Sequence, residues 1–371
     1  MNEIQGLTTW AEIDLKAVDH NLNQIENHLQ PNSNIIAVVK ANAYGHGAVE
    51  VTKVVQEHER VKMLAVATIE EGVELRKAGV ELPILVLGTI LESRIPEIIY
   101  YELTPVVYTL NTAQKISEQA QREGKEVKVH LGIDTGMGRI GILVGDQPVD
   151  KIKTIVNFDY LTVGGVFTHF AAADEDNGYT QEQLNKFNGL LSKLEAEGID
   201  IPITHAANSA AIIDFPETHF DLVRLGIALY GLPPAPSLAN KIDLKPVLSW
   251  KAHVVHVKTV ASGTNISYGC TYTSDEETKV ATLAVGYYDG YDRRLSNQAE
   301  VLVKGQRAEV IGRVCMDQIM IDVTGIEVKK GDTVTLIGCD GDKEISAQEL
   351  ADKIGTINYE VICRIGPRVK R

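Results

Sequence analysis

The sequence predicts an α/β fold, in which an N-terminal (β/α)8 barrel is followed by a mostly β C-terminal domain. Two observations favour it. Short apolar runs alternate with amphipathic helical patterns through the first two thirds of the 371 residues, and closely spaced β-rich runs fill the last third. With 44% hydrophobic and 23% charged residues, the composition is globular, and the length is sufficient for two domains.

The first part of the chain reads as repeated strand–helix units. Residues 15 to 29 have apolar side chains three and four apart behind Asp14, a good N-cap, so they predict an amphipathic helix. Further helices are expected at Thr112–Glu123 and Gln181–Glu197, each followed by a glycine suited to a left-handed C-cap. Eight buried strands are expected at Ile35–Val39, Met63–Thr68, Pro83–Leu87, Pro105–Tyr108, Val127–Ile133, Leu161–Phe167, Ile203–Ala207 and Asp221–Leu229.

Eight such alternations within about two hundred residues fit a closed barrel. An open doubly wound sheet is the alternative, because periodicity does not show whether a sheet closes. The proline-rich stretch GLPPAPSLAN cannot continue a helix or a central strand, and it marks a boundary. We therefore expect a barrel over residues 12–238 and a C-terminal β domain over residues 239–371, completed by residues 1–11.

The C-terminal third predicts short strands and one helix. The helix is expected to begin at Ser346, which has the capping-box spacing to Glu349. The strands are expected at His253–Val260, Val280–Val285, Ala299–Val303, Glu309–Val314, Ile319–Val323 and Thr333–Ile337.

Charge and composition exclude several classes of protein. A net charge of −14 argues against binding to nucleic acid and against attraction to anionic membranes, although a local cleft can still attract a small anion. Four cysteines without a C-x-x-C spacing indicate reduced thiols. The N-terminus has no secretory pattern, and no apolar run is long enough to cross a bilayer, so we expect a cytoplasmic protein.

One motif points toward a dinucleotide but lacks the right context. Residues 136–141, GMGRIG, match G-x-G-x-x-G after an apparent strand. The fingerprint works only when its glycines open a helix, and here ILVGD follows instead. We therefore do not expect a nicotinamide cofactor.

Polar residues gather where the predicted barrel strands end, which is where barrel enzymes place their active sites. Lys40 ends the first strand, Arg139 follows the fifth and His169 ends the sixth. Asn208 and Ser209 follow the seventh strand, and Arg224, Gly226 and Ile227 close the eighth unit.

A serine at a helix N-terminus and a nearby glycine suit a phosphate, and a lysine at the same rim suits an aldehyde. Together they suggest pyridoxal 5′-phosphate (PLP), whose aldehyde forms a Schiff base with lysine. His169 with Asp174 could instead be half of a metal site, but no third ligand is found, so no metal is expected.

The segments AVVKANAYGHG, IDTGMGRIG, THFAAADE, AANSAA, VRLGIALYG, SYGCTYT, VGYYDGY, GRVCMDQ and INYE together resemble the alanine racemase family, nearly end to end and in order. The resemblance implies an isomerase that interconverts L-alanine and D-alanine with PLP, supplying D-alanine for peptidoglycan. It also implies a homodimer whose active sites are shared across the interface.

The resemblance also assigns roles to residues. Lys40 is the Schiff-base lysine and the base on the D-face, and Tyr268 of the other subunit is the opposite base. Arg224 faces the pyridine nitrogen, which weakens the ring as an electron sink, and His169 lies against the ring. The phosphate is held by Tyr44, Asn208, Ser209, Gly226, Ile227 and Tyr359, and the substrate carboxylate by Arg139 and the backbone of Met316.

One position departs from the family. Many relatives have a lysine two residues before the Asp of IDTGMGR, and its carbamate steadies the arginine; here Gly132 stands there. We therefore expect no carbamyl-lysine, and Arg139 must be held by another group, such as a bound chloride or a nearby acid. The bulk of Tyr359 and Tyr268 implies alanine as the first substrate, with weak activity on serine.

Three alternatives remain open at this point. One is a barrel-type PLP decarboxylase of a basic amino acid, and another is a non-catalytic PLP-binding regulator. The last is a metal hydrolase built on His169 and Asp174. Carbon dioxide release would identify the decarboxylase, and loss of activity to chelators would identify the hydrolase. The regulators generally lack a C-terminal domain like the one that supplies Tyr268 here.

Overall fold

The computed structural model describes residues 6–175 and 178–371. It divides into two compact units. Of the described residues, the barrel unit comprises 15–43, 47–175 and 178–245, and the C-terminal unit comprises 6–14, 44–46 and 246–371. The sequence boundary at 238/239 stays a prediction, and residues 1–5 of the predicted C-terminal domain lie outside the described part.

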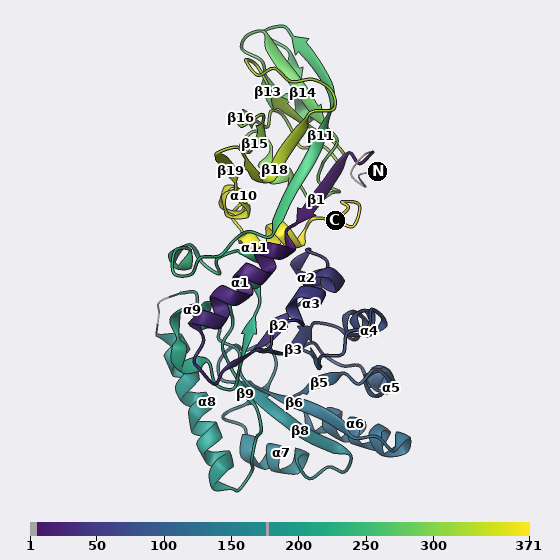
Figure 1. The fold of residues 1–371 in the computed structure, drawn as a ribbon, viewed down its shortest axis with the longest axis vertical. Helices are drawn as coiled ribbons and strands as arrows, with labels where there is room; N and C mark the ends of the chain where they lie inside the picture. Colours follow the sequence, from purple (N-terminus) through teal and green to yellow (C-terminus); the bar gives the residue numbers. More distant parts are fainter. Residues whose placement is uncertain (1–5, 176–177) are drawn as a thin grey trace. The chain divides into compact units, whose positions relative to one another are not determined.

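The barrel unit is a closed parallel barrel, which confirms the predicted fold class and excludes the open sheet. Its strands follow the order β5-β4-β3-β2-β10-β9-β8-β6, and the additional pairing of β5 with β6 closes the ring (Figure 1). These strands are β2 (Asn34–Val38), β3 (Val61–Val66), β4 (Ile84–Val86), β5 (Thr104–Val107), β6 (Val127–Asp134), β8 (Leu161–Phe167), β9 (Thr204–His205) and β10 (Leu222–Leu225). A short ninth strand, β7 (Ile142–Leu143), pairs with β6 only.

The helices of the barrel unit lie between these strands along the chain and bury one apolar face. They are α1 (Leu15–His28), α2 (Lys40–Tyr44), α3 (Ala48–Val55), α4 (Ile69–Lys77), α5 (Ile95–Tyr100), α6 (Leu110–Glu123), α7 (Pro148–Ile155), α8 (Tyr179–Ala196) and α9 (Ser209–Asp214), although the last residue of α2, Tyr44, is counted in the C-terminal unit. Short 3₁₀ turns occur at η1 (Glu92–Arg94), η2 (Pro216–Thr218), η3 (Ile227–Tyr230) and η4 (Pro236–Leu238). Gly124 ends α6 at φ 64°, as the sequence predicts, and Gly198 follows α8 at φ 72°.

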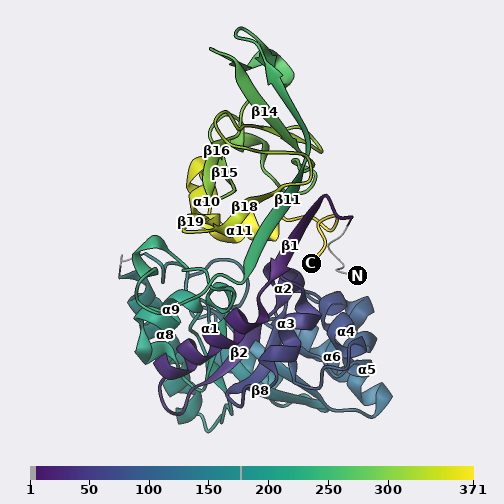
Figure 2. The ribbon, with the colours of Figure 1, turned by 45° about the horizontal axis from the view of Figure 1, so that its top comes forward.

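The C-terminal unit is mostly antiparallel β structure, as predicted, with the long strand β11 between β14 and β18 (Figure 2). Its strands are β1 (Thr9–Ile13), β11 (Leu248–Val260), β12 (Asn265–Ile266), β13 (Tyr272–Thr273), β14 (Thr278–Leu283), β15 (Glu300–Val303), β16 (Gln306–Glu309), β17 (Ile319–Asp322), β18 (Thr333–Asp340) and β19 (Lys343–Ile345). Two 3₁₀ turns, η5 (Tyr268–Cys270) and η6 (Arg293–Leu295), and two helices, α10 (Ala347–Ile354) and α11 (Asn358–Cys363), complete it.

Two predicted strands differ from the structure. The strand predicted at Asp221–Leu229 ends at Leu225, and the 3₁₀ turn η3 follows from Ile227. The sequence predicts Glu309–Val314, whereas the strand β16 ends at Glu309 and only an isolated bridge links Val310 to Ile321. Gly312 explains the difference, because its φ of +75° cannot continue a strand and an added Cβ there would lie 2.7 Å from that of Ser267.

The predicted helix start at Ser346 is confirmed, but only half of the capping box forms. The Ser346 side chain accepts a hydrogen bond from the Glu349 N–H at 3.0 Å. The Glu349 carboxylate instead accepts two hydrogen bonds from Arg307, at 2.8 and 2.9 Å. In the described part of the chain, no helix is long and apolar enough to cross a membrane.

Candidate active site

Lys40 stands where β2 ends, at the start of an unusual turn. Ala41, Asn42 and Ala43 have φ of 52–53°, so the chain makes a left-handed turn of L-residues directly after the lysine. This conformation costs roughly 1–2 kcal/mol per residue, and backbone of this kind persists only where surrounding contacts fix it. The turn directs the chain away from the strand immediately after the ammonium group.

Several hydrogen bonds hold that turn. The Ala41 N–H donates to a carboxylate oxygen of Glu71 at 2.6 Å, and the other oxygen of Glu71 accepts from the Ala67 N–H at 2.7 Å. Asn42 accepts from the Ala48 N–H through its side chain at 2.8 Å. The strained turn is therefore tied to the start of α4 and to α3, which makes the position of Lys40 a built feature of the barrel.

His169 and Arg224 meet inside the barrel unit. The Nη2 group of Arg224, which carries two protons, donates to the carbonyls of Thr168 and Ala206, each at 2.7 Å, and to His169 Nδ1 at 3.1 Å. Because Arg224 can only donate, His169 must accept at Nδ1 and carry its proton on Nε2. Gln183 binds the His169 carbonyl at 3.0 Å and so fixes the end of the strand as well.

Three cations surround His169. Burial is the main cause that lowers its pKa to about 3, and the charges of Arg224, Arg139 and Lys40 lower it further. His169 is therefore neutral at pH 7, although it lies among groups predicted to bind anions. This local positive field is opposite in sign to the net charge of −14.

Ser209 and Gly226 meet at the ends of β9 and β10. Ser209 Oγ accepts hydrogen bonds from the N–H groups of Gly226, at 3.0 Å, and Ala228, at 3.4 Å. Its own hydroxyl proton is therefore available to an acceptor. Asn208 caps α9 by accepting from the Ala211 N–H at 3.0 Å. Ile227 begins η3, and the first N–H groups of a helix have no partner within it.

These features fit PLP. The cradle offers a hydroxyl and backbone N–H donors for a phosphate, a lysine for the aldehyde and an arginine for the pyridine nitrogen, all within the barrel unit.

The loop with the G-x-G-x-x-G pattern does not form a phosphate cradle. Asp134 Oδ1 accepts from the N–H groups of Gly136, at 2.9 Å, and Gly138, at 3.1 Å. A carboxylate of the protein thus occupies the donors that a pyrophosphate would need, and the short strand β7 follows instead of a helix.

Arg139, in the same loop, is exposed. Among the described residues, no carboxylate forms an ion pair with it, so the nearby acid that the sequence allowed as its support is not found. At Gly132, an added Cβ would make only ordinary contacts, at 3.4 Å with Val106 and 3.5 Å with Phe167.

Tyr268 and Met316 belong to the C-terminal unit and are both strongly exposed, at 71% and 51%. The Met316 carbonyl accepts from the Tyr288 N–H at 3.1 Å, which leaves the Met316 N–H as its backbone donor. Gly286 permits this close packing, since a Cβ there would lie 2.3 Å from the Met316 oxygen.

Tyr44 and Tyr359 also lie in the C-terminal unit. Their ring centroids are 6.2 Å apart with the planes tilted by 51°. Burial is the main cause that raises the pKa of Tyr44 well above that of a free phenol, so Tyr44 keeps its proton and can donate a hydrogen bond.

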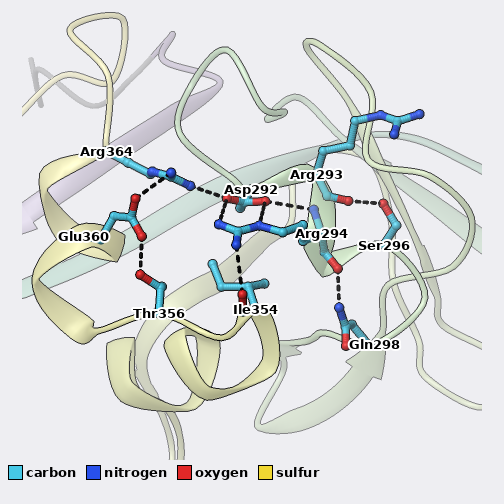
Figure 3. Close-up of polar contacts among 9 residues, drawn as sticks. All are labelled: Asp292, Arg293, Arg294, Ser296, Gln298, Ile354, Thr356, Glu360 and Arg364. Atoms are coloured by element: carbon cyan, nitrogen blue, oxygen red, sulfur yellow. Dashed lines mark hydrogen bonds and ion pairs between the residues drawn. The ribbon is translucent and has the colours of Figure 1, made fainter.

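A cluster of arginines around Asp292 lies close to the segment of Tyr359 (Figure 3). Arg294 donates to Asp292 at 2.8 Å and to the Ile354 carbonyl at 2.9 Å. Arg364 bridges Asp292 and Glu360, the latter at 2.6 Å. The Arg293 side chain points away from this cluster. Arg293 also lines a surface hollow together with Tyr287, Gly290, Asp292 and Arg364.

Sequence reasoning missed two residues of the site. His205 Nδ1 accepts from Arg224 Nη1 at 2.8 Å, and His205 Nε2 lies 2.9 Å from His130 Nδ1. Neither histidine ends a predicted strand, although His205 is the last residue of β9 in the structure. The available signal was only that two histidines stand inside otherwise apolar strand patterns.

Comparisons with known proteins agree with this geometry. Residues 13–234 match the family profile "Alanine racemase, N-terminal domain" and residues 247–371 match "Alanine racemase, C-terminal domain". The chain belongs to the alanine racemase family. An alanine racemase of Halothermothrix orenii is 50% identical over 100% of this chain and 98% of its own. Racemisation of alanine, the isomerase reaction of this family, is therefore the function that the fold serves.

Solved structures show the same architecture. An alanine racemase of Clostridium difficile 630 has a TM-score of 0.93 and 43% identity, covering 98% of this chain and 95% of its own. One from Bartonella henselae, solved with covalently bound pyridoxal phosphate, has a TM-score of 0.88 and 28% identity, covering 98% and 99%.

Proposed function

We propose that this chain racemises alanine with PLP bound to Lys40, and that Lys40 and Tyr268 of a second subunit act as bases on opposite faces of the substrate. Family membership supports PLP dependence, and the fixed turn after Lys40 supports that residue as its attachment point. When bound, PLP supplies an electron sink that makes the Cα proton of an amino acid acidic.

Two opposite bases are needed because racemisation removes a proton from one face of Cα and delivers another to the opposite face. A single rigid base would mostly return its proton to the face from which it came. Lys40 is half-buried and lies two residues after the end of β2, so its position is set by the barrel. Tyr268 is 71% exposed in the single chain, which leaves its phenol available to a neighbouring subunit.

Arg224 is proposed to donate a hydrogen bond to the pyridine nitrogen. A guanidinium does not readily release its proton, so it stabilises an unprotonated ring nitrogen and limits how much charge the ring accepts. The neutral His169, held by Arg224 through Nδ1, would lie against the ring when the cofactor is bound. This arrangement disfavours long-lived carbanions and side reactions such as transamination.

The phosphate is proposed to accept hydrogen bonds from the Ser209 hydroxyl and from the Ile227 N–H, while Gly226, whose N–H donates to Ser209 Oγ, holds that hydroxyl in place. Asn208 fixes the start of the supporting turn. The phenols of Tyr44 and Tyr359 complete the set by the family resemblance, and the raised pKa of Tyr44, due to burial, supports it as a donor.

Substrate recognition is proposed to rest on charge at one end and size at the other. Arg139 and the Met316 N–H bind the carboxylate, while Tyr268 and Tyr359 restrict the side chain. Larger amino acids are excluded sterically, whereas serine adds only one hydroxyl and is rejected weakly. Alanine is therefore expected to turn over faster than serine, and equal rates would overturn this ranking. D-alanine for peptidoglycan is the proposed use of the product.

A subunit-mixing experiment tests the shared site. Lys40→Ala and Tyr268→Phe each remove one base, so each homodimer is expected to be inactive. A randomly mixed population contains heterodimers in which one site has both defects and the other has none, which restores about a quarter of the wild-type activity. If mixing restores nothing although heterodimers form, both bases come from one chain and the proposal fails. Mixing wild type with itself under the same conditions provides the control.

A further inference from the structure

A chain of three buried side chains crosses the inside of the barrel behind the site. Arg224 lies on β10, His205 on β9 and His130 on β6, and they are linked by contacts of 2.8 and 2.9 Å. His130 and His205 are fully buried and Arg224 is 4% exposed. β8 separates β6 from β9, so the contact between the histidines spans one strand.

The strand in between makes room for this contact. A Cβ at Gly165 of β8 would lie 2.8 Å from His130 Cε1. Any larger residue at this position would therefore displace the His130 ring. On the other side, the ring of Phe167 stacks on His205 at 4.8 Å with an 11° tilt, and the Arg224 guanidinium lies 5.2 Å from the centre of the same ring.

The donors along this chain can be arranged in one way only. Arg224 can only donate, so His205 must accept at Nδ1 and carry its proton on Nε2. That Nε2–H then donates to His130 Nδ1, which forces the proton of His130 onto its own Nε2. Protonation of either imidazole would place two donors face to face. Both histidines are therefore neutral, in agreement with the depressed pKa values that burial imposes on them.

The acceptors around Arg224 are all uncharged. They are His205, His169 and the carbonyls of Thr168 and Ala206. No carboxylate among the described residues pairs with this guanidinium, although a buried arginine usually has one. These acceptors thus fix the orientation of the Arg224 guanidinium without cancelling its positive charge.

We propose that His205 and His130 are positioning residues that hold Arg224 with a neutral, one-directional hydrogen-bond chain and leave its positive charge uncompensated toward the cofactor ring. The proposal rests on the assignment of Arg224 to the pyridine nitrogen. An aspartate in place of His205 would compensate the positive charge of Arg224. Without the acceptor nitrogen of His130, the His205 ring would be free to rotate.

The test compares two substitutions of the outermost member. His130→Leu removes the acceptor for His205, whereas His130→Asn keeps an oxygen near the position of Nδ1. Ser117→Ala is the matched control, because it also removes a hydrogen bond of the barrel, that from Ser117 Oγ to the Asp159 carbonyl at 2.6 Å, away from the site.

The first readout is ¹⁵N NMR of His205 in the full-length protein, both with its cofactor and after the cofactor has been removed. We expect an unprotonated Nδ1 and a protonated Nε2 in the wild type. If Nδ1 of His205 is protonated at neutral pH, or if both ring nitrogens are, the proposed hydrogen-bond chain is refuted, whether or not the protein binds PLP. This separates failure of the inference from failure of the proposed function.

The second readout is kinetic and spectroscopic. A misplaced group near the reacting centre can cost ~10²-fold, so we expect kcat of His130→Leu to fall by ~10- to 10²-fold. KM for alanine should change little, since the carboxylate contacts remain. In His130→Leu, the absorbance band of the bound cofactor should shift and transamination should increase. In His130→Asn, kcat, the absorbance band and transamination should all lie close to those of the wild type. If His130→Leu behaves like Ser117→Ala in all three measures, the positioning role is refuted.

Discussion

Arg224 in the barrel and Arg368 in the C-terminal unit show two uses of one side chain. Arg368 donates to Asp289 at 2.7 and 3.1 Å and to Asp317 at 2.8 Å, and it lies 4.6 Å from the centre of the Tyr288 ring. Those carboxylates, Asp289 first, raise its pKa. Arg224 has a similar place over an aromatic ring but no carboxylate, and burial, aided by the charge of Arg139, lowers its pKa to about 9.

The difference separates structural charge from functional charge. A guanidinium compensated by carboxylates ties segments together and offers little field to a ligand. One held only by carbonyls and imidazoles keeps its field, at a cost in desolvation that folding must offset elsewhere. The barrel contains Arg224 in such surroundings. Burial, and with it the charges of Arg224, Arg139 and Lys40, lowers the pKa of His169, beside which the cofactor and the substrate carboxylate are proposed to bind.

The largest expected effect is that of Lys40→Ala. Both the covalent attachment of PLP and one base are lost, so racemisation in both directions should drop by more than the ~10²–10⁴-fold that one positioned acid–base group contributes. Absorbance of the purified protein and rates from each enantiomer check this. Retention of the cofactor band with substantial activity would show that another amine carries PLP.

Arg224→Gln is expected to have the next largest effect. Loss of a preorganised charge at the ring should lower kcat by ~10²–10³-fold, while KM for alanine changes less. Steady-state kinetics and the partition between racemisation and transamination measure it. If Arg224→Gln kept the wild-type kcat, the charge of Arg224 would have no catalytic role, and the proposed difference between Arg224 and Arg368 would be wrong.

Asp289→Ala tests whether the charge of Arg368 has a structural role. It leaves Arg368 without its main partner and the buried Gly286 N–H without its acceptor, which lies at 2.8 Å. Unfolding free energy, measured with urea, should fall by about 1–3 kcal/mol. Activity should fall far less than in Arg224→Gln. A stable protein that has lost turnover would contradict this assignment.

The smallest expected effect is a pH dependence of stability. Burial lowers the pKa of His130 to about 4, whereas an unfolded histidine titrates near ~6.5. Between these values the unfolded chain binds the additional proton, so stability falls as the pH decreases, by up to about 1.4 kcal/mol per pH unit for this group. Urea unfolding at pH 7 and pH 5.5 should therefore show a steeper loss in the wild type than in His130→Asn, and parallel losses would count against a neutral His130.

Much of the fold can be predicted from local sequence signals. The spacing of apolar residues, glycines at helix ends and prolines that interrupt helices or strands each act over only a few residues. The eight barrel strands and the helix at residues 15–28 follow such patterns. The strand expected at Glu309–Val314 failed since Gly312 takes a left-handed φ that its apolar neighbours do not reveal. Likewise, no propensity predicts a left-handed turn of two alanines and an asparagine after Lys40; contacts with Glu71 and α3 impose it.

The site was partly visible in the sequence for a related reason. Polar residues at strand ends, such as Lys40 and His169, stand out against apolar runs. His130 and His205 lie inside predicted apolar strands, 75 positions apart, and their contact exists only once the barrel closes. Gly132 illustrates the reverse case: the missing lysine is evident from the sequence, yet the structure shows no described carboxylate that replaces it beside Arg139.

The most direct measurement for the two-base account is exchange of the Cα proton with deuterium from solvent in Tyr268→Phe, starting from each enantiomer separately. With Lys40 as the D-face base, the variant should still exchange D-alanine, while exchange of L-alanine and net racemisation fall by ~10²–10⁴-fold. Undiminished exchange of L-alanine by this variant would contradict the account.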